Sequence, residues 1–182
     1  MDATSIKNSL EDAQARGEII RVYREGLEDG WADGFVAGVG PDFFAVQLID
    51  KACRVDGFNC LRYCDITDLT VPTPHAHFLE RALLARGQTQ VSGLAIELTS
   101  LPTLLQSAGK AFPLVSIFYE TDEGVCYIGR VQGVTASEVR MLDISPDAQW
   151  DSTPTLHPLA GITRVDFGGA YEEALLLVAP AS

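Results

Sequence analysis

Two cysteines and two histidines lie near one another in the chain and are the residues best suited to hold a metal ion. Cys60 and Cys64 are followed by His75 and His77, all within 18 residues. Sets of four thiolates and imidazoles are the usual ligands of structural zinc. Cys60 and Cys64, however, fall in or at the end of an apolar segment typical of a strand, where cysteines are commonly small buried side chains. We therefore expect no metal and no other cofactor.

Residues for nucleophilic or acid–base catalysis are few. The chain has 3 histidines, and none lies in a motif typical of a nucleophile with its base. Paired carboxylates occur at Glu28-Asp29 and Asp122-Glu123, in equivalent polar loops of a very acidic chain. Such pairs can act in proton transfer, but acidic residues in loops more often form a solvated surface. We expect the protein not to be an enzyme, with a metal-dependent or hydrolytic enzyme as an alternative.

Aromatic residues give the other functional signal. Trp31, Tyr63 and Trp150, together with Arg62, are candidates for a recognition surface. Tryptophan, tyrosine and arginine are the residue types most enriched at binding hot spots. Packing in the core explains the same aromatic residues equally well, so both interpretations stay open.

Composition restricts the possible partners. The chain of 182 residues has a formal net charge of −12 and no run of Lys and Arg, which disfavours general binding of nucleic acid or of anionic lipid. No segment approaches the roughly 20 apolar residues needed to span a bilayer. The N-terminal residues lack the pattern of a secretion signal. We expect a cytoplasmic protein whose 4 cysteines are free thiols.

The chain repeats itself at an offset of about 95 residues. This offset aligns Leu10 with Leu105 and Val22 with Ile117, and it places the Gly-x-Val-x-Gly segment at 34–38 on the one at 129–133. Later matches shift slightly: Leu48 with Leu142 at 94, Ile66 with Ile162 at 96, and Leu83 with Leu175 at 92. Because the matches stay in order from end to end, we infer two copies of one unit.

Each copy is predicted to form a helix, several short strands and a closing helix. Helix start and stop residues, apolar periodicity and turn residues set these boundaries. The expected helices cover 5–15, 77–85, 101–108 and 171–178, and the expected strands cover 19–24, 31–39, 43–49, 58–63, 66–69, 114–120, 125–134, 138–144 and 162–167. Prolines at 154 and 158 predict a weak or irregular fourth strand in the second copy, within 147–158.

Five short strands with bending glycines predict a small barrel in each copy. The fold class expected is mainly β with short helices: two tandem Sm/SH3-like small β-barrels, each with an N-terminal and a C-terminal helix. The first barrel takes residues 1–86 and the second 99–182. Residues 87–98 are either a linker or an extra edge strand, with 91–96 as the candidate strand.

A helix followed by five short strands, with Gly-x-apolar-x-Gly in the bent second strand, resembles the Sm-like family of SH3-like barrels, which includes the LSm and Hfq proteins. The resemblance covers about 5–69 and 101–167, and the segment 162–171 is similar to the end of bacterial proteins of this barrel type. It implies assembly into rings and binding of uridine-rich RNA. Neither copy has the family's Asn after the glycines, and Leu61-Arg62-Tyr63 keeps only part of its apolar-Arg-Gly motif.

These observations favour a non-enzymatic binding and assembly module, in which exposed strand edges of the barrels pair with another subunit or a protein partner. The alternative is an Sm-like protein that binds RNA on a locally basic face around Arg54, Arg62, Arg81 and Arg86. The specific partner, the pathway and the oligomer number do not follow from the sequence.

Overall fold

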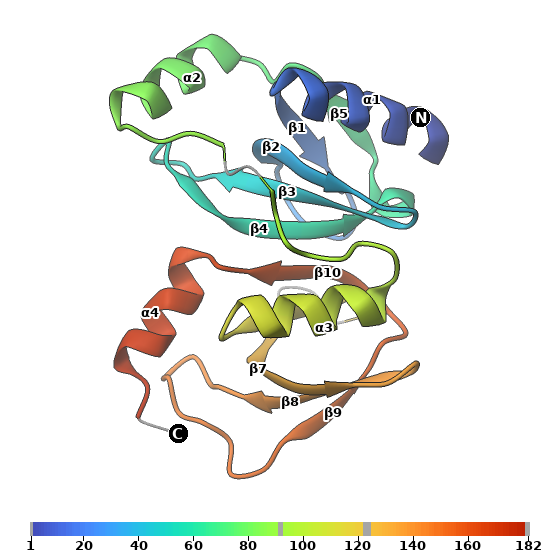
Figure 1. The fold of residues 1–182 in the computed structure, drawn as a ribbon, viewed down its shortest axis with the longest axis vertical. Coiled ribbons are helices and arrows are strands. Elements are labelled where there is room, and N and C mark those ends of the chain that lie inside the picture. Colours follow the sequence, from blue (N-terminus) through green and yellow to red (C-terminus); the bar gives the residue numbers. More distant parts are fainter. Residues whose placement is uncertain (1, 91–92, 122–124, 181–182) are drawn as a thin grey trace.

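The computed structural model describes residues 2–90, 93–121 and 125–180. Two halves of the chain follow one another, and the N and C ends lie at opposite ends of the molecule (Figure 1). The first half consists of α1 (Ala3–Arg16), β1 (Ile19–Tyr23), β2 (Ala32–Val39), β3 (Phe43–Ile49), β4 (Val55–Arg62), the 3-10 turn η1 (Tyr63–Asp65), β5 (Asp68–Thr70) and α2 (Ala76–Ala85). The second consists of α3 (Leu101–Ala111), β6 (Val115–Tyr119), β7 (Cys126–Val134), β8 (Glu138–Asp143), β9 (Thr155–Pro158), β10 (Ile162–Phe167) and α4 (Ala170–Val178).

The strands form one open antiparallel sheet of ten strands in the order β5-β1-β2-β3-β4-β10-β6-β7-β8-β9. The prediction of two tandem Sm/SH3-like small β-barrels is therefore wrong, although a mainly β protein with short helices is correct. The physical reason lies in the middle of the sheet. The edge of β4 is hydrogen-bonded to β10 of the other half, so the two half-sheets merge instead of each closing on itself (Figure 1).

Strand order and register are the same in both halves. Gly34 of β2 lies opposite Leu48 of β3, and Gly129 of β7 lies opposite Asp143 of β8, each 95 residues further along. The β-bulge after Val36 recurs after Val131 at the same offset. For the last two strands of each half, β4 with β9 and β5 with β10, equivalent residues are 96 positions apart. The alignment of Leu48 with Leu142 is wrong by one residue, because the register makes Asp143 the counterpart of Leu48.

Helices cover the sheet through short apolar stripes. In α1, Ile6, Leu10 and Ala13 are buried at helical spacing, and the helix begins at the Asp2 cap and ends at Gly17 in the left-handed conformation. It packs on β2, and α3 packs on β7 and β6. Under α3, one continuous core contains side chains from both halves, with residues such as Phe58 and Cys60 of β4 beside Phe167 of β10.

The closing helices pack in the same way in both halves. Leu83 of α2 meets Ile19 and Ile49, and Leu175 of α4 meets Leu114 and Ile144. These residues are related by offsets of 92 to 95, as the two contact sets occupy equivalent strands.

The predicted weak fourth strand of the second half is present as β9, which is 4 residues long. Residues 87–90 and 93–98 contain no strand, and Val91 and Ser92, part of the candidate strand at 91–96, lie outside the described residues. Leu98 of this connection packs over Gly38 and Gly40 and joins the shared core. The end of the connection thus packs against β2 at the shared core.

Gly34 permits the close approach of β2 and β3. A Cβ atom at this position would lie 2.2 Å from the backbone oxygen of Gln47 and 2.6 Å from Val46 Cγ1. The Gln47 oxygen belongs to the backbone and cannot move without displacing β3. Gly133, which follows the equivalent bulge in β7, has no atom within 4 Å of such a Cβ.

We expect Gly34→Ala to destabilise the fold by about 2 kcal/mol or more, because the methyl group collides with the β3 backbone. Urea unfolding followed by circular dichroism measures the change. Gly133→Ala is the matched control and should stay within about 0.5 kcal/mol of wild type. Equal effects of the two substitutions would contradict the role assigned to Gly34.

Candidate functional site

The junction between the halves places polar side chains in the middle of the sheet. In the antiparallel pairing of β4 and β10, Leu61 lies opposite Arg164 and Asn59 lies opposite Asp166. On the other side of β10, Asp166 lies opposite Ser116 of β6. Since residues directly opposite one another share a face of the sheet, Asn59, Asp166 and Ser116 form a polar row across three strands.

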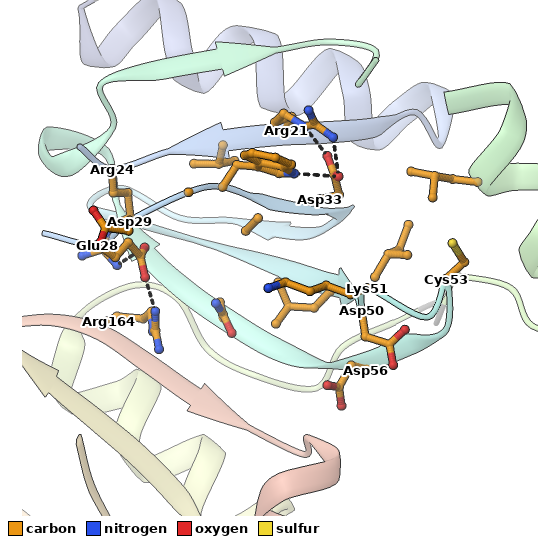
Figure 2. A pocket seen from close by; sticks show the side chains of 18 residues that line it. Arg21, Arg24, Glu28, Asp29, Asp33, Asp50, Lys51, Cys53, Asp56 and Arg164 are labelled. Carbon is orange, nitrogen blue, oxygen red and sulfur yellow. Dashed lines mark hydrogen bonds and ion pairs between the residues drawn. The ribbon is translucent and has the colours of Figure 1, made fainter. Parts of the chain in front are cut away.

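A network of ion pairs crosses the junction beside this row. The Arg24 guanidinium, only 3% exposed, lies 3.0 Å from Glu28 Oε1 and 3.5 Å from Asp65 Oδ2. The other oxygen of Glu28 accepts a short hydrogen bond from Arg164 of β10. Figure 2 shows Glu28 between Arg24 and Arg164. The loop after β1 is thereby attached to the second half, and burial of these charges makes each one depend on its partners.

Asp166 is the most perturbed acid of the junction. Its Oδ2 atom lies 3.1 Å from Arg164 Nε, whereas its buried Oδ1 atom accepts no hydrogen bond from any described residue. Burial raises the pKa of Asp166 to about 7; Glu172 and Glu28 also raise it, and Arg164 opposes them. Glu172 is itself buried in α4 and accepts a hydrogen bond of 2.6 Å from Ser116 Oγ.

A cavity of about 550 Å³ opens beside the ion pairs, within the size range of small-molecule sites. Figure 2 shows Arg21 and Asp33 on one side of it, Asp50 and Lys51 on the other, and Glu28 and Arg164 at one end. Its lining includes the indole of Trp31, which is 57% exposed.

The Trp31 ring is held in place by its neighbours. Its Nε1–H donates to Asp33 at 3.2 Å, and the Arg21 guanidinium lies 4.4 Å from the ring centroid. Arg21 forms two hydrogen bonds to Asp33, of 2.7 and 2.8 Å, and Thr73 donates a third of 2.6 Å. The indole is therefore an exposed aromatic surface with a fixed orientation.

A second cavity of about 240 Å³ lies on the α4 side of the junction. Ser116, Cys126, Asp166 and Glu172 line it. The two cavities share Leu48, Asp56, Asn59 and Arg164 in their lining, so they are adjacent across β4 and β10, and together they are called the groove. Asp56 is occupied as a cap, because it accepts the backbone N–H of Ala170 at the start of α4.

Of the four predicted binding residues, Trp31 alone lines the cavities described here. Arg62 forms a two-pronged pair with Asp65 through hydrogen bonds of 2.6 and 2.7 Å. Tyr63 is buried and donates its hydroxyl hydrogen to the Gly40 carbonyl, and burial raises its pKa. Trp150 packs at the C-terminal end of the chain, where its Nε1–H donates to the Pro180 carbonyl.

The weak metal candidates are spread over different environments. Cys60 is buried in the shared core, Cys64 is exposed in η1, and His75 and His77 begin α2. Among the described residues, no group of three or more His, Cys, Asp or Glu side chains is placed to hold a metal ion. Of the predicted acidic pairs, Glu28-Asp29 lines the larger cavity, and Asp122-Glu123 lies outside the described residues.

Three of the four arginines of the predicted RNA-binding face have protein partners among the described residues, and Arg81 is the exception. Arg54 pairs with Asp50 at 2.8 Å, and Arg86 donates to the Ala52 carbonyl at 3.1 Å, in addition to the Arg62–Asp65 pair. Binding of phosphate at these groups would compete with those contacts. RNA binding stays a prediction that the geometry does not favour.

Most of the groove was missed by sequence reasoning. Asn59 stands within an apolar strand, Phe58-Asn59-Cys60-Leu61, and a single polar residue in such a run was the available signal. Arg164 and Asp166 alternate with apolar residues, a pattern that predicts a solvated face. The pairing with β4, which places Leu61 and Asn59 beside these residues, is a contact between residues about 105 positions apart.

Comparisons with family models, with curated proteins and with solved structures found no match to this chain. The resemblance to the Sm-like family therefore stays a prediction. None of the helices formed by the described residues has the length and apolarity that crossing a bilayer requires.

The raised pKa of Asp166 predicts how its substitution depends on pH. Asp166 has an ordinary pKa near 3.8 in the unfolded chain and a pKa of about 7 in the folded protein. Between these two pH values, the folded protein therefore keeps a proton on Asp166 that the unfolded chain has lost. The destabilisation that Asp166 causes, measured as a loss in the free energy of unfolding, is therefore absent at low pH. It grows from about pH 4 to about pH 7 and is constant at higher pH. We expect Asp166→Asn to gain stability relative to wild type over this range, by on the order of 1 to 3 kcal/mol.

Urea unfolding of wild type and variant at several pH values measures this difference. Asp151→Asn, at an exposed position, is the control and should show no such trend. A difference between wild type and Asp166→Asn that does not change with pH would contradict the assignment.

Proposed function

We propose that this chain is a non-catalytic assembly module that binds further copies of itself head to tail through its two outermost strands. The observation that carries the proposal is the pairing of β4 with β10 inside the chain. By strand order and register, β9 is the equivalent of β4, and β5 is the equivalent of β10. The two outermost strands of the sheet, β9 and β5, are thus the repeat equivalents of the two strands that pair at its centre, β4 and β10.

The internal junction supplies a register for the contact between chains. Cys60 lies opposite Val165, and Asn59 lies opposite Asp166. Moving each residue to its equivalent 96 positions away gives Leu156 opposite Leu69 of the next chain, and Thr155 opposite Thr70. Leucine pairs and threonine pairs are favourable cross-strand neighbours in antiparallel sheets.

Exposure at the edges supports this contact. Leu156 is 58% exposed on β9, although the equivalent Cys60 is fully buried in the shared core. Pairing with β5 of a second chain would cover it. The strands are short, with 4 residues in β9 and 3 in β5, and Pro158 ends β9. Such edges limit the contact area, so we expect association that depends on concentration.

The two edges are different surfaces, so the contact is heterologous. Repetition of a heterologous contact gives a closed ring where the rotation closes and an open filament where it does not. Either product has a mass well above the 19.6 kDa of a single chain.

We expect light scattering of wild-type protein to give a mass that rises with concentration above 19.6 kDa. Leu156→Lys should reduce that mass to a single chain, because a lysine replaces the apolar contact at the edge. Leu177→Lys is the matched control, since Leu177 is 85% exposed on α4 and away from both edges, and it should associate as wild type does. A wild-type mass fixed at that of one chain at millimolar concentration would contradict the proposal.

Cross-linking tests the register directly. In a Cys64→Ser background, Leu69→Cys combined with Leu156→Cys should form a disulfide between chains on mild oxidation. Leu177→Cys combined with Leu69→Cys should not. Equal cross-linking of both pairs would show that association does not use the β9–β5 register.

A further inference from the structure

The floor of the groove contains an amide side chain that has no hydrogen-bond partner among the described residues. Asn59 is 8% exposed, its side chain borders both cavities, and it forms no hydrogen bond with the residues that the structure describes. The fully enclosed polar atoms that lack a partner do not include those of Asn59, so its amide still reaches the groove. The amide of Asn59 is therefore available to a bound molecule.

Asp166, directly across the β4–β10 seam, offers a second acceptor. Its Oδ1 atom is buried and accepts no hydrogen bond from the described residues, while Arg164 Nε lies 3.1 Å from its Oδ2 atom. The Asn59 amide has both donors and an acceptor, whereas an ionised Asp166 has acceptors alone, so a ligand that brings N–H donors can satisfy both groups. Ammonium and guanidinium groups carry donors only, and both are cations.

The charge of the groove agrees with a cationic ligand. Together the two cavities are lined by 4 cationic and 7 acidic side chains, a formal balance of −3 when Asp166 is ionised. The whole chain has a net charge of −12, so the surrounding field also attracts cations.

The larger cavity also contains an aromatic surface, which can attract a cation. Trp31 is fixed by Asp33, and one guanidinium, that of Arg21, already lies 4.4 Å from its ring centroid. Much of the indole stays exposed and is able to contact the alkyl chain or the charged group of a ligand.

We propose that the groove across β4 and β10 binds an organic cation, an alkylammonium or alkylguanidinium group, which donates hydrogen bonds to Asn59 and Asp166 and lies against Trp31. The source of the group is either a small free amine or guanidine, or the side chain of a lysine or arginine in a peptide. This binding does not depend on the association of chains through β9 and β5.

Titration with matched small probes tests the charge requirement. In a Trp150→Phe background, Trp31 is the one remaining tryptophan and its fluorescence reports on the groove. We expect butylguanidinium or butylammonium to change this fluorescence and to titrate by calorimetry. Butylurea, which is neutral but of similar shape, and butanoate should bind at least about tenfold more weakly, a loss of about 1.4 kcal/mol.

Variants test the assigned contacts. Asn59→Leu and Asp166→Asn should each weaken binding of the cationic probe by about tenfold or more. Asn8→Ala and Asp151→Asn, both at exposed positions, are the matched controls and should bind as wild type does. Thermal unfolding by circular dichroism checks that each variant is folded, and a variant that is not folded is replaced by Asn59→Ser or Asp166→Ser.

A tripeptide with a central arginine distinguishes the two sources. Tighter binding of this peptide than of butylguanidinium assigns the site to a polypeptide side chain, and weaker binding assigns it to a small free cation. The proposal is overturned if butylurea binds as tightly as butylguanidinium, if no cationic probe binds at millimolar concentration, or if Asp166→Asn leaves the affinity unchanged.

Discussion

The hydrogen-bonded pairing of β4 with β10 is the contact on which the rest of this structure depends. It converts two five-stranded sheets into one sheet and allows a single core to form under α3 from both halves. It also brings Arg164 and Asp166 beside Asn59, in the interior of the molecule. Backbone pairing at an otherwise open edge satisfies a row of N–H and C=O groups, which gives the junction its basic stability.

The register of this junction is fixed by what each face carries. On one face of β10, Val165 and Phe167 enter the shared core, and on the other face Arg164 and Asp166 meet charged partners. A slip of one residue would exchange the faces and place both charges in the apolar core. The ion pairs from Arg24 through Glu28 to Arg164 therefore specify the alignment of the halves as well as compensate buried charge.

The halves keep the same framework and differ in what they place on it. The leucine or isoleucine contacts beneath α2 and α4 are equivalent, whereas the apolar Leu48 and Leu61 of the first half correspond to Asp143 and His157 in the second. His157 Nε2 lies 2.8 Å from Asp143 Oδ2 in that buried position. The packing contacts that both halves share thus determine the fold. Differences between the halves at single equivalent positions determine where polar sites occur.

The sequence by itself determined the helices, nearly all strands and the repeat, because apolar periodicity, caps and bending glycines act over a few residues. It also predicted Trp31 as a binding residue; the structure places Trp31 in the lining of the larger cavity, and binding itself stays a prediction. Only the tertiary structure decided that β4 pairs with β10 instead of closing a barrel, and that Asn59, Arg164 and Asp166 line the groove. An unpaired strand edge carries the same backbone groups whatever its side chains are, so local sequence does not specify which edge it meets. The groove forms only because β4 pairs with β10. In the sequence alone, its residues therefore look like ordinary strand positions.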